Sequence, residues 1–142
     1  MAMTMHVNIV SAEESIFSGT AEELFAPAAL GEVGIMPRHT PLLSVLKPGE
    51  VRVKTEDSND TLHFFVSGGI LEVQPHVVTV LADSAVRAKD LDEAEAQAAK
   101  ERAEEAMANR KADIDFARAQ AELAEAEARL RMIRNLKQGR QG

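Results

Sequence analysis

Residues Asp90–Leu136, DLDEAEAQAAKERAEEAMANRKADIDFARAQAELAEAEARLRMIRNL, are rich in alanine and contain neither glycine nor proline. This composition indicates two long helices, separated where the pattern breaks at Asn109–Ala112. One face of the second helix carries residues that recur every three or four positions, namely Phe116, Ala119, Leu123, Ala126, Leu130 and Ile133. The first helix has alanines at the same spacing, Ala96, Ala99, Ala103 and Ala106. We therefore expect an antiparallel helical hairpin.

Packing within this hairpin is expected to be weak. Full burial of a large apolar side chain contributes roughly 1.5 to 3 kcal/mol, but a row of alanine methyl groups covers only part of each facing side chain. Isolated helices of this length are also only modestly stable in water. The segment is therefore predicted to be a movable arm that can exchange its packing partners.

Acidic residues mark where both helices begin. Asp90 is predicted to accept hydrogen bonds from the free amides of the first helix while Glu93 reaches back, and Asp113 or Asp115 is predicted to cap the second. Within the second helix, two acid-first pairs at i,i+4 add a few tenths of a kcal/mol each, Glu125 with Arg129 and Glu127 with Arg131.

The chain up to about residue 85 has short alternating runs separated by turn residues, a pattern typical of a β-sandwich. Turns are predicted at Ser18-Gly19, Pro48-Gly49, Asp57–Asp60 and Gly68-Gly69. Strands are expected at His6–Val10, Glu23–Ala26, Glu50–Lys54, Thr61–Val66, Ile70–Val73 and Val77–Leu81. The predicted fold class is α+β, with an N-terminal antiparallel β-sandwich at residues 1–86 and a C-terminal helical hairpin at residues 87–142.

Composition limits the classes of function. The 142 residues include no cysteine, which excludes disulfides and thiolate metal sites. No apolar run approaches the roughly 20 residues needed to cross a bilayer, and Met1–Val10 lacks the features of a signal peptide, so we expect a soluble, cytosolic chain. A net charge of −7 argues against nucleic-acid binding.

The charge is unevenly distributed between the helices. Asp90–Glu105 holds seven acids, whereas the chain from Arg129 onward holds five bases and no acid. Two interpretations remain open from charge alone. The bases are either a solvated helix end that complements the helix dipole, or a cationic surface with a function.

The residues needed for catalysis are not found in a recognisable pattern. The four histidines, His6, His39, His63 and His76, are far apart, and no metal-ligand spacing, nucleophile motif or phosphate-binding loop occurs. His63 is expected on the outward face of a strand and His76 in a turn. We therefore expect no enzyme, no catalytic residue, no metal and no cofactor.

The segment Gly31–Leu43 is interpreted as a rigid loop because two glycines and two prolines fix its path. Glu32, Arg38 and His39 give this loop an exposed polar set beside apolar Ile35 and Met36. An ordinary connector and a partner-binding surface are both open at this point, because loops on rigid scaffolds often carry function.

Several motifs resemble one family over nearly the whole chain. They are Val10-Ser11-Ala12-Glu13 with Phe17-Ser18-Gly19, the Gly31–Leu43 segment, Ser67–Val73, Val78–Ala82 and the acidic start Asp90-Leu91-Asp92-Glu93-Ala94. On these motifs the chain closely resembles the epsilon subunits of bacterial F-type ATP synthases.

The resemblance implies a non-catalytic rotor subunit of the central stalk, peripheral on the cytoplasmic face of the bacterial plasma membrane. The sandwich would bind the gamma subunit and the membrane-embedded c-ring, coupling proton flow to ATP synthesis. The loop motif implies ring contacts at Glu32, Gly34, Pro37, Arg38 and His39. The hairpin would fold on the sandwich or extend along gamma and inhibit ATP hydrolysis, with Arg129, Arg131 and Arg134 facing the alpha and beta subunits of the catalytic head.

One departure from the family concerns nucleotide. Some members bind ATP through a first-helix motif, Ile/Leu-Asp-x-x-Arg-Ala, whose positions here include Asp92 and Glu95. Glu95 replaces the motif arginine, and a carboxylate repels a triphosphate, so we expect no ATP binding. Two other functions are compatible with parts of the sequence, namely an adapter whose alanine face binds coiled coils and an acid/base enzyme that uses Glu32 and His39.

Overall fold

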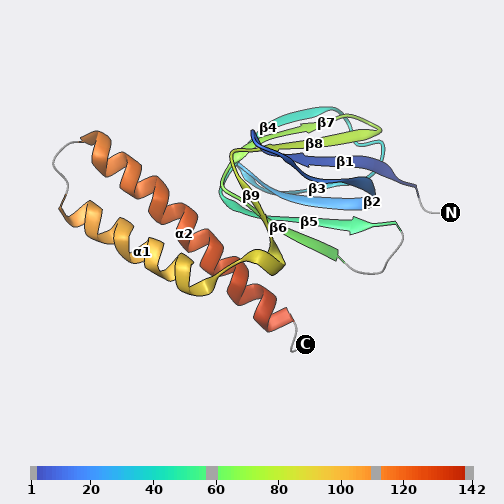
Figure 1. Cartoon of the computed structure of the whole chain (residues 1–142). Coiled ribbons are helices and arrows are strands. Elements are labelled where there is room, and N and C mark those ends of the chain that lie inside the picture. Colours follow the sequence, from blue (N-terminus) through green and yellow to red (C-terminus); the bar gives the residue numbers. More distant parts are fainter. Residues whose placement is uncertain (1–2, 57–60, 110–112, 140–142) are drawn as a thin grey trace. The chain divides into compact units, whose positions relative to one another are not determined.

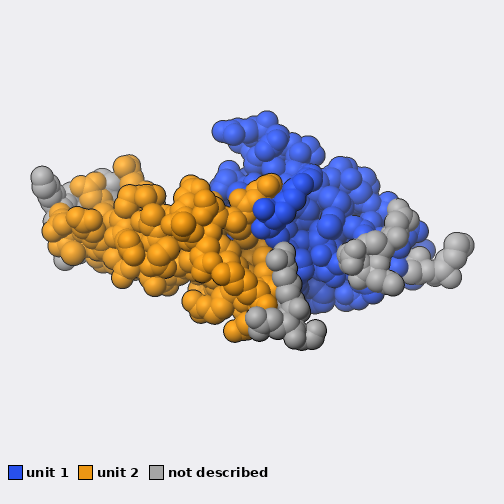
Figure 2. Space-filling model, turned by 60° about the horizontal axis from the view of Figure 1, so that its bottom comes forward, with its two compact units in different colours: residues 1–89 blue, residues 90–142 orange. Residues whose placement is uncertain are grey.

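The computed structural model describes residues 3–56, 61–109 and 113–139 of the chain. The structure divides into two compact units, Met1–Lys89 and Asp90–Gly142, which Figure 2 shows in different colours. The predicted turn at Asp57–Asp60 lies outside the described residues, as does most of the turn predicted at Asn109–Ala112.

The first unit is a β-sandwich. Its strands in the described part of the chain are β1 (Met5–Val10), β2 (Ser15–Ala28), β3 (Gly31–Ile35), β4 (Leu42–Leu46), β5 (Gly49–Thr55), β6 (Thr61–Val66), β7 (Gly69–Val73), β8 (Val77–Ala82) and β9 (Ala85–Arg87). Figure 1 shows two layers, one formed by β1, β8, β7 and β4 and the other by β3, β2, β5, β6 and β9. Neighbouring strands are antiparallel except for β1 and β8, which pair in parallel.

Strand β2 joins the two layers because it is 14 residues long. Its first part pairs with β1, and its second part pairs with β3 and β5. The apolar residues that alternate along each strand point between the layers, so Val7 and Ile9 of β1 and Val51 and Val53 of β5 are fully buried.

Several strand boundaries differ from those predicted from the sequence. Ser18 and Gly19 do not form a turn but pair with Asn8 and Val7 inside the β1–β2 ladder. The chain reverses earlier, where the Ser11 amide donates to the Glu14 carbonyl at 2.9 Å. The predicted loop at Gly31–Leu43 is also mostly strand, since β3 begins at its first residue and β4 at Leu42.

Gly69 is required at the start of β7. Its φ is +142°, and a Cβ atom at this position would lie 2.1 Å from the carbonyl oxygen of Leu81 on the neighbouring strand. Only glycine adopts this conformation easily and permits so close an approach between strands.

The second unit is the predicted helical hairpin. A short 3₁₀ turn, η1 (Ala88–Asp90), precedes α1 (Glu93–Ala108) and α2 (Asp113–Gly139). The predicted cap was wrong by two residues, because Asp92 is the N-cap of α1 and its Oδ1 accepts from the Glu95 amide at 3.1 Å. Asp90 instead ends the 3₁₀ turn, which places its side chain too early to cap α1. Asp115 lies inside α2, whereas the side chain of Asp113 is not described.

Many of the residues on the predicted faces of the two helices are buried. The buried residues on these faces are Ala96, Ala103, Ala119, Ala126 and Ile133, while Phe116, Leu123 and Leu130 remain partly exposed. The prediction fails at Ala106, which is exposed, because the face continues through partly buried Met107 four residues after Ala103. Ala128 and Met132 are also buried, although they lie on α2 outside the predicted face.

Candidate functional site

Glu32 lies on the outer face of the sandwich, in the second position of β3. Its carboxylate accepts two hydrogen bonds from Arg52 of β5, Nη2 to Oε1 at 2.9 Å and Nη1 to Oε2 at 3.1 Å. The side chain of Glu32 remains 49% exposed and that of Arg52 30% exposed. Both oxygens of an accessible carboxylate are therefore held by one guanidinium.

Arg52 is itself held from several directions. Its Nη1 also donates to Glu50 Oε1 at 3.3 Å, and its guanidinium carbon lies 4.9 Å from the centre of the Phe25 ring. His63 Nδ1 lies 3.2 Å from the second Glu50 oxygen. We call Glu32, Arg52, Glu50, His63 and Phe25 the Arg52 network.

Hydrogen bonding to Glu32 raises the pKa of Arg52 above its ordinary value, against the lowering effect of partial burial. The bonds to Glu50 and the charges of both carboxylates act in the same direction as Glu32. A raised pKa means that the stabilisation from this pairing is complete below the ordinary arginine pKa and is lost only as pH rises through the raised value. Arg52 is thus cationic at every physiological pH.

Strand register builds this network. Gly34, Phe25, Arg52 and His63 are successive cross-strand partners on β3, β2, β5 and β6. A Cβ atom at Gly34 would lie 2.8 Å from the Phe25 ring, so the missing side chain leaves room for that ring. The predicted site residues Glu32 and Gly34 lie in or beside this network, whereas Arg52 was not predicted, because the register that pairs the strands is not visible in the sequence of a single strand.

Pro37, Arg38 and His39 occupy the connection between β3 and β4. The Arg38 amide donates to the Pro75 carbonyl at 2.8 Å, and the His39 amide donates to the Met36 carbonyl at 3.2 Å. The φ of Arg38 is +66°, which is rare for a residue with a side chain. His39 Nδ1 lies 2.6 Å from the Thr40 carbonyl oxygen. Glu32 precedes the extended segment Val33–Ile35 and His39 follows it, so the fold does not bring the two residues together.

A second feature of the sandwich is an exposed apolar row, formed by Val45, Ile70 and Leu81. These residues are direct cross-strand partners on β4, β7 and β8. Their exposed fractions are 63%, 42% and 46%, and Leu43, two positions before Val45, is 71% exposed. This row was not predicted from the sequence, because β4 was not predicted and Leu43 and Val45 therefore had no assigned face.

The arginines at the basic end of α2 differ in how exposed they are to a binding partner. Arg131 and Arg134 are exposed. Arg129 is partly buried, and its Nη2 bonds Glu125 Oε1 at 3.2 Å, which is the ion pair predicted from the i,i+4 spacing. The prediction that all three arginines lie on exposed faces of the helix is wrong for Arg129, whose side chain is partly buried.

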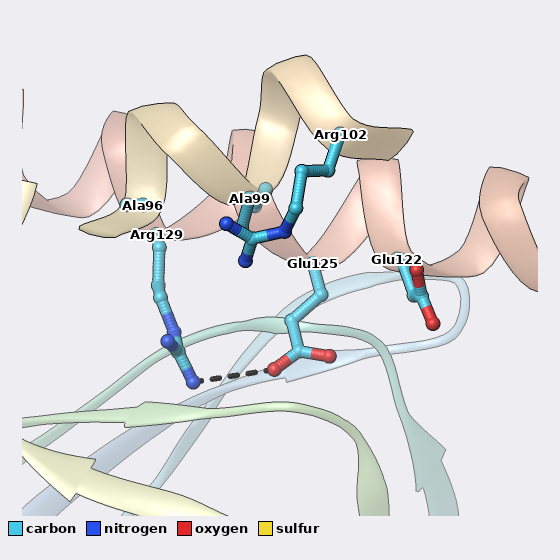
Figure 3. Close-up of a pocket in the computed structure, with 7 residues that line it drawn as sticks. Ala96, Ala99, Arg102, Glu122, Glu125 and Arg129 are labelled. Carbon is cyan, nitrogen blue, oxygen red and sulfur yellow. Dashed lines mark hydrogen bonds and ion pairs between the residues drawn. The ribbon is translucent and has the colours of Figure 1, made fainter. Parts of the chain in front are cut away.

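A pocket of about 320 Å³ lies on the hairpin. Figure 3 shows Ala96, Ala99 and Arg102 from α1 and Glu122, Glu125 and Arg129 from α2, with the Arg129–Glu125 ion pair inside the pocket. Two cations and two carboxylates line it, so the lining has no net charge. Neither Asp92, the α1 cap, nor exposed Glu95 is among the lining residues.

The described part of the chain shows neither a metal-binding cluster nor a membrane-spanning helix. Within it, no group of three or more His, Asp or Glu side chains is arranged to hold a metal ion. Among the same residues, no helix combines the length and apolar character that crossing a membrane requires.

Two family models match the chain in succession. The model described as "ATP synthase, Delta/Epsilon chain, beta-sandwich domain" matches residues 4–88, and "ATP synthase, Delta/Epsilon chain, long alpha-helix domain" matches residues 89–134. The chain belongs to this delta/epsilon-chain family of ATP synthase. The resemblance drawn from its sequence motifs is therefore confirmed.

Within this family the chain is similar to curated epsilon chains over almost its whole length. It is 69% identical to the ATP synthase epsilon chain of Thioalkalivibrio sulfidiphilus, covering 96% of this chain and 97% of that one. It is 66% identical to the epsilon chain of Nitrosococcus oceani with the same coverage. The epsilon chain is a structural subunit of ATP synthase and not its catalytic subunit, as the sequence analysis expected.

Solved structures of mitochondrial ATP synthases contain the same fold. A chain in the Euglena gracilis structure "OSCP/F1/c-ring in rotational state 1" matches with a TM-score of 0.78 at 20% identity, covering 88% of this chain and 78% of that one. A chain in the Tetrahymena thermophila "central stalk/cring" structure matches with a TM-score of 0.61 at 16% identity, covering 92% and 97%. At these identities the likeness establishes the fold alone.

Proposed function

We propose that this chain is a rotor subunit in the central stalk of a proton-translocating F-type ATP synthase. In this role it couples proton flow through the c-ring to ATP synthesis, and its hairpin inhibits ATP hydrolysis. The observation that carries the proposal is the match of both delta/epsilon-chain domain models, in order, across residues 4–134. The complex would hold the subunit at the cytoplasmic face of the bacterial plasma membrane.

The gamma subunit is the proposed partner of the apolar row. Contiguous exposed apolar side chains mark interaction surfaces, because leaving them in water is unfavourable. Val45, Ile70 and Leu81 form such a surface on a rigid sheet. A rotor subunit must bind gamma tightly in order to turn with it. A preformed sheet face can do so without the entropic cost of ordering a loop.

The c-ring is the proposed partner of Glu32, Gly34, Pro37, Arg38 and His39. Glu32 offers a fixed, accessible carboxylate, and Pro37, Arg38 and His39 lie in a connection held by backbone hydrogen bonds. Since Glu32 lies in β3 and His39 lies in the connection that follows it, this contact would extend from the strand into the connection rather than being concentrated at one loop tip.

The hairpin is the proposed regulatory arm. Its facing residues include many alanines, and Leu123 and Leu130 stay partly exposed, so little apolar burial is lost when the helices separate. The extended arm would place its basic end, Arg129, Arg131 and Arg134, against acidic segments of the alpha and beta subunits. Contacts of this charge-assisted kind contribute about 1.5 to 3 kcal/mol each.

We propose that the hairpin pocket does not bind ATP. Glu125 already pairs with Arg129, and Glu122 adds a second carboxylate to the same lining. The exposed Glu95 replaces the arginine of the nucleotide motif. In this pocket the two carboxylates would repel a triphosphate and offset the attraction of the two arginines. Nucleotide binding is therefore not part of the proposed mechanism.

The rival functions lack comparable support. An acid/base enzyme would need Glu32 and His39 together, yet they lie beyond opposite ends of Val33–Ile35, and both Glu32 oxygens are bound to Arg52. A free adapter would not require a sandwich with an exposed apolar row. Membership of the delta/epsilon-chain family favours the stalk subunit over both.

The deciding experiment removes residues 90–142 and reconstitutes the remaining chain into the enzyme. We expect assembly and proton-coupled synthesis to persist, and ATP hydrolysis to increase. Hydrolysis unchanged by the truncation would contradict the inhibitory role of the hairpin. Loss of assembly would contradict the assignment of gamma binding to the sandwich.

A further inference from the structure

The feature of interest is how Arg52 holds Glu32. The two side chains come from β3 and β5, which are not neighbours, since β2 lies between them. The guanidinium therefore reaches across a strand, over the Phe25 ring, to engage both carboxylate oxygens. A surface ion pair needs no such arrangement, and an isolated one contributes little to stability.

We propose that Arg52 is a positioning residue, which fixes the direction in which the Glu32 carboxylate faces the polar loops of the c-ring. This inference rests on the proposed ring contact of Glu32. A free glutamate samples many rotamers and loses that freedom when it binds. Arg52 removes most of this freedom in advance, because a bidentate pair fixes both the position and the plane of the carboxylate.

Arginine suits this task better than lysine. Its planar guanidinium stacks on Phe25 while its N–H groups reach Glu32 on one side and Glu50 on the other. Lysine has a single flexible ammonium and cannot form the two parallel bonds. Gly34 contributes indirectly, because it leaves room for the ring on which the guanidinium rests.

The ion pair with Arg52 also changes the charge of the surface that the c-ring would cover. An unpaired carboxylate would lose its hydration when a partner covers it, which is costly. With Arg52 bound, part of that charge is already compensated, while the outer lone pairs of the 49% exposed side chain still accept hydrogen bonds. Neutral polar loops with N–H or O–H donors are the surface that such a paired carboxylate fits.

The test compares five full-length variants: Glu32→Gln, Arg52→Gln, Arg52→Lys, the Glu32→Gln/Arg52→Gln double variant, and Lys54→Gln as control. Lys54 lies on the same strand face and pairs with Glu22 at 3.5 Å, so its loss removes a cross-strand ion pair without touching Glu32. Each variant is assembled into the catalytic head, and binding of the head to ring-containing membranes is titrated. The carboxyl carbon resonance of Glu32 in the isolated chain reports its pairing independently of any partner.

We expect Arg52→Gln to shift the Glu32 resonance and to raise the apparent Kd for the membranes about two- to tenfold, the factor that ordering one long side chain represents. Arg52→Lys should lie between Arg52→Gln and the parent, Lys54→Gln should match the parent, and the double variant should bind no more weakly than Glu32→Gln. If Glu32→Gln binds like the parent, the ring contact itself is wrong. If Glu32→Gln weakens binding and Arg52→Gln does not, or if the double variant is weaker than Glu32→Gln, the positioning role is overturned while the ring contact stands.

Discussion

Lys137 Nζ lies 2.5 Å from Glu93 Oε2, although 44 positions separate the two residues in the chain. Glu93 is the first residue of α1, and Lys137 lies in the last turn of α2. This ion pair therefore joins the start of α1 to the end of α2, at the end of the hairpin opposite the turn that connects the helices. Both side chains are more than half exposed, so the contribution to stability is small, about 0 to 1 kcal/mol.

Glu93→Gln should shift the hairpin toward its extended, inhibitory form. Loss of up to ~1 kcal/mol changes the ratio of the two forms by up to about fivefold. Hydrolysis by the reconstituted enzyme should fall accordingly, and the difference from the parent should shrink at about 1 M salt, where charges are screened beyond ~3 Å. Glu104→Gln, which changes an exposed acid in the middle of α1, is the matched control. Equal effects of the two substitutions would show that net charge rather than this contact matters.

Residues 1–89 should fold as an isolated fragment. The fragment retains the whole apolar core between the two sheet layers, and its last strand is tied back where Arg87 Nη2 donates to the Ile16 carbonyl at 2.7 Å. We expect cooperative thermal unfolding by circular dichroism and binding to gamma. A fragment that is unfolded in buffer would disprove the independence of this unit.

The strands show which sequence signals are reliable. Alternation predicted β1 and β5 correctly because each carries a run of β-branched residues with one face buried. It found only part of β2, through the predicted strand Glu23–Ala26, and it missed β3, because Gly19, Gly31 and Gly34 suggested turns and loops. Those glycines lie in strands, because pairing across the sheet outweighs their weak local preference.

The candidate site was predictable only in part. Family motifs drew attention to Glu32 and His39, but a motif does not reveal what a side chain touches. Arg52 is 20 positions from Glu32, and their contact depends on β2 lying between their strands. The Asp92 cap was missed for a simpler reason, since Asp90 and Asp92 are both good caps and the 3₁₀ turn that selects between them is not visible in the sequence.

Ile70→Ser should weaken binding of the subunit to gamma without unfolding the sandwich. Ile70 is the middle residue of the apolar row and is 42% exposed in the isolated chain, so its replacement costs little there. Burial against gamma would contribute up to roughly 1.5 to 3 kcal/mol, which corresponds to about a ten- to hundredfold rise in Kd. Leu62→Ser, at an exposed apolar residue of β6 outside the row, should leave the Kd near that of the parent. Calorimetric titration of gamma would show the difference, and similar losses in both variants would argue against this face.

The isolated subunit should not bind ATP below millimolar concentrations. Its hairpin pocket has as many carboxylates as cations, and Arg129 is already paired with Glu125. Replacing Glu95 with arginine and Glu125 with glutamine should create weak binding, because one cation is added and another is released from its partner. Isothermal titration calorimetry measures both. A micromolar dissociation constant for the parent chain would contradict the charge argument.

The strongest test of the regulatory arm separates its three arginines. Arg131 and Arg134 are exposed, whereas Arg129 bonds Glu125 within the hairpin. The double variant Arg131→Gln/Arg134→Gln should therefore remove contacts of the extended state only, while Arg129→Gln also removes a contact of the folded hairpin and should relieve inhibition less. Shifting an equilibrium from 1:99 to 99:1 takes about 5.5 kcal/mol, and two charge-assisted contacts of about 1.5 to 3 kcal/mol each can supply most of it.

We expect the double variant to hydrolyse ATP faster in the reconstituted enzyme, to retain synthesis, and to melt within a few degrees of the parent as an isolated chain. Hydrolysis equal to that of the parent would mean that the basic end is only a solvated helix terminus, and that any inhibition comes from the bulk of the extended helices.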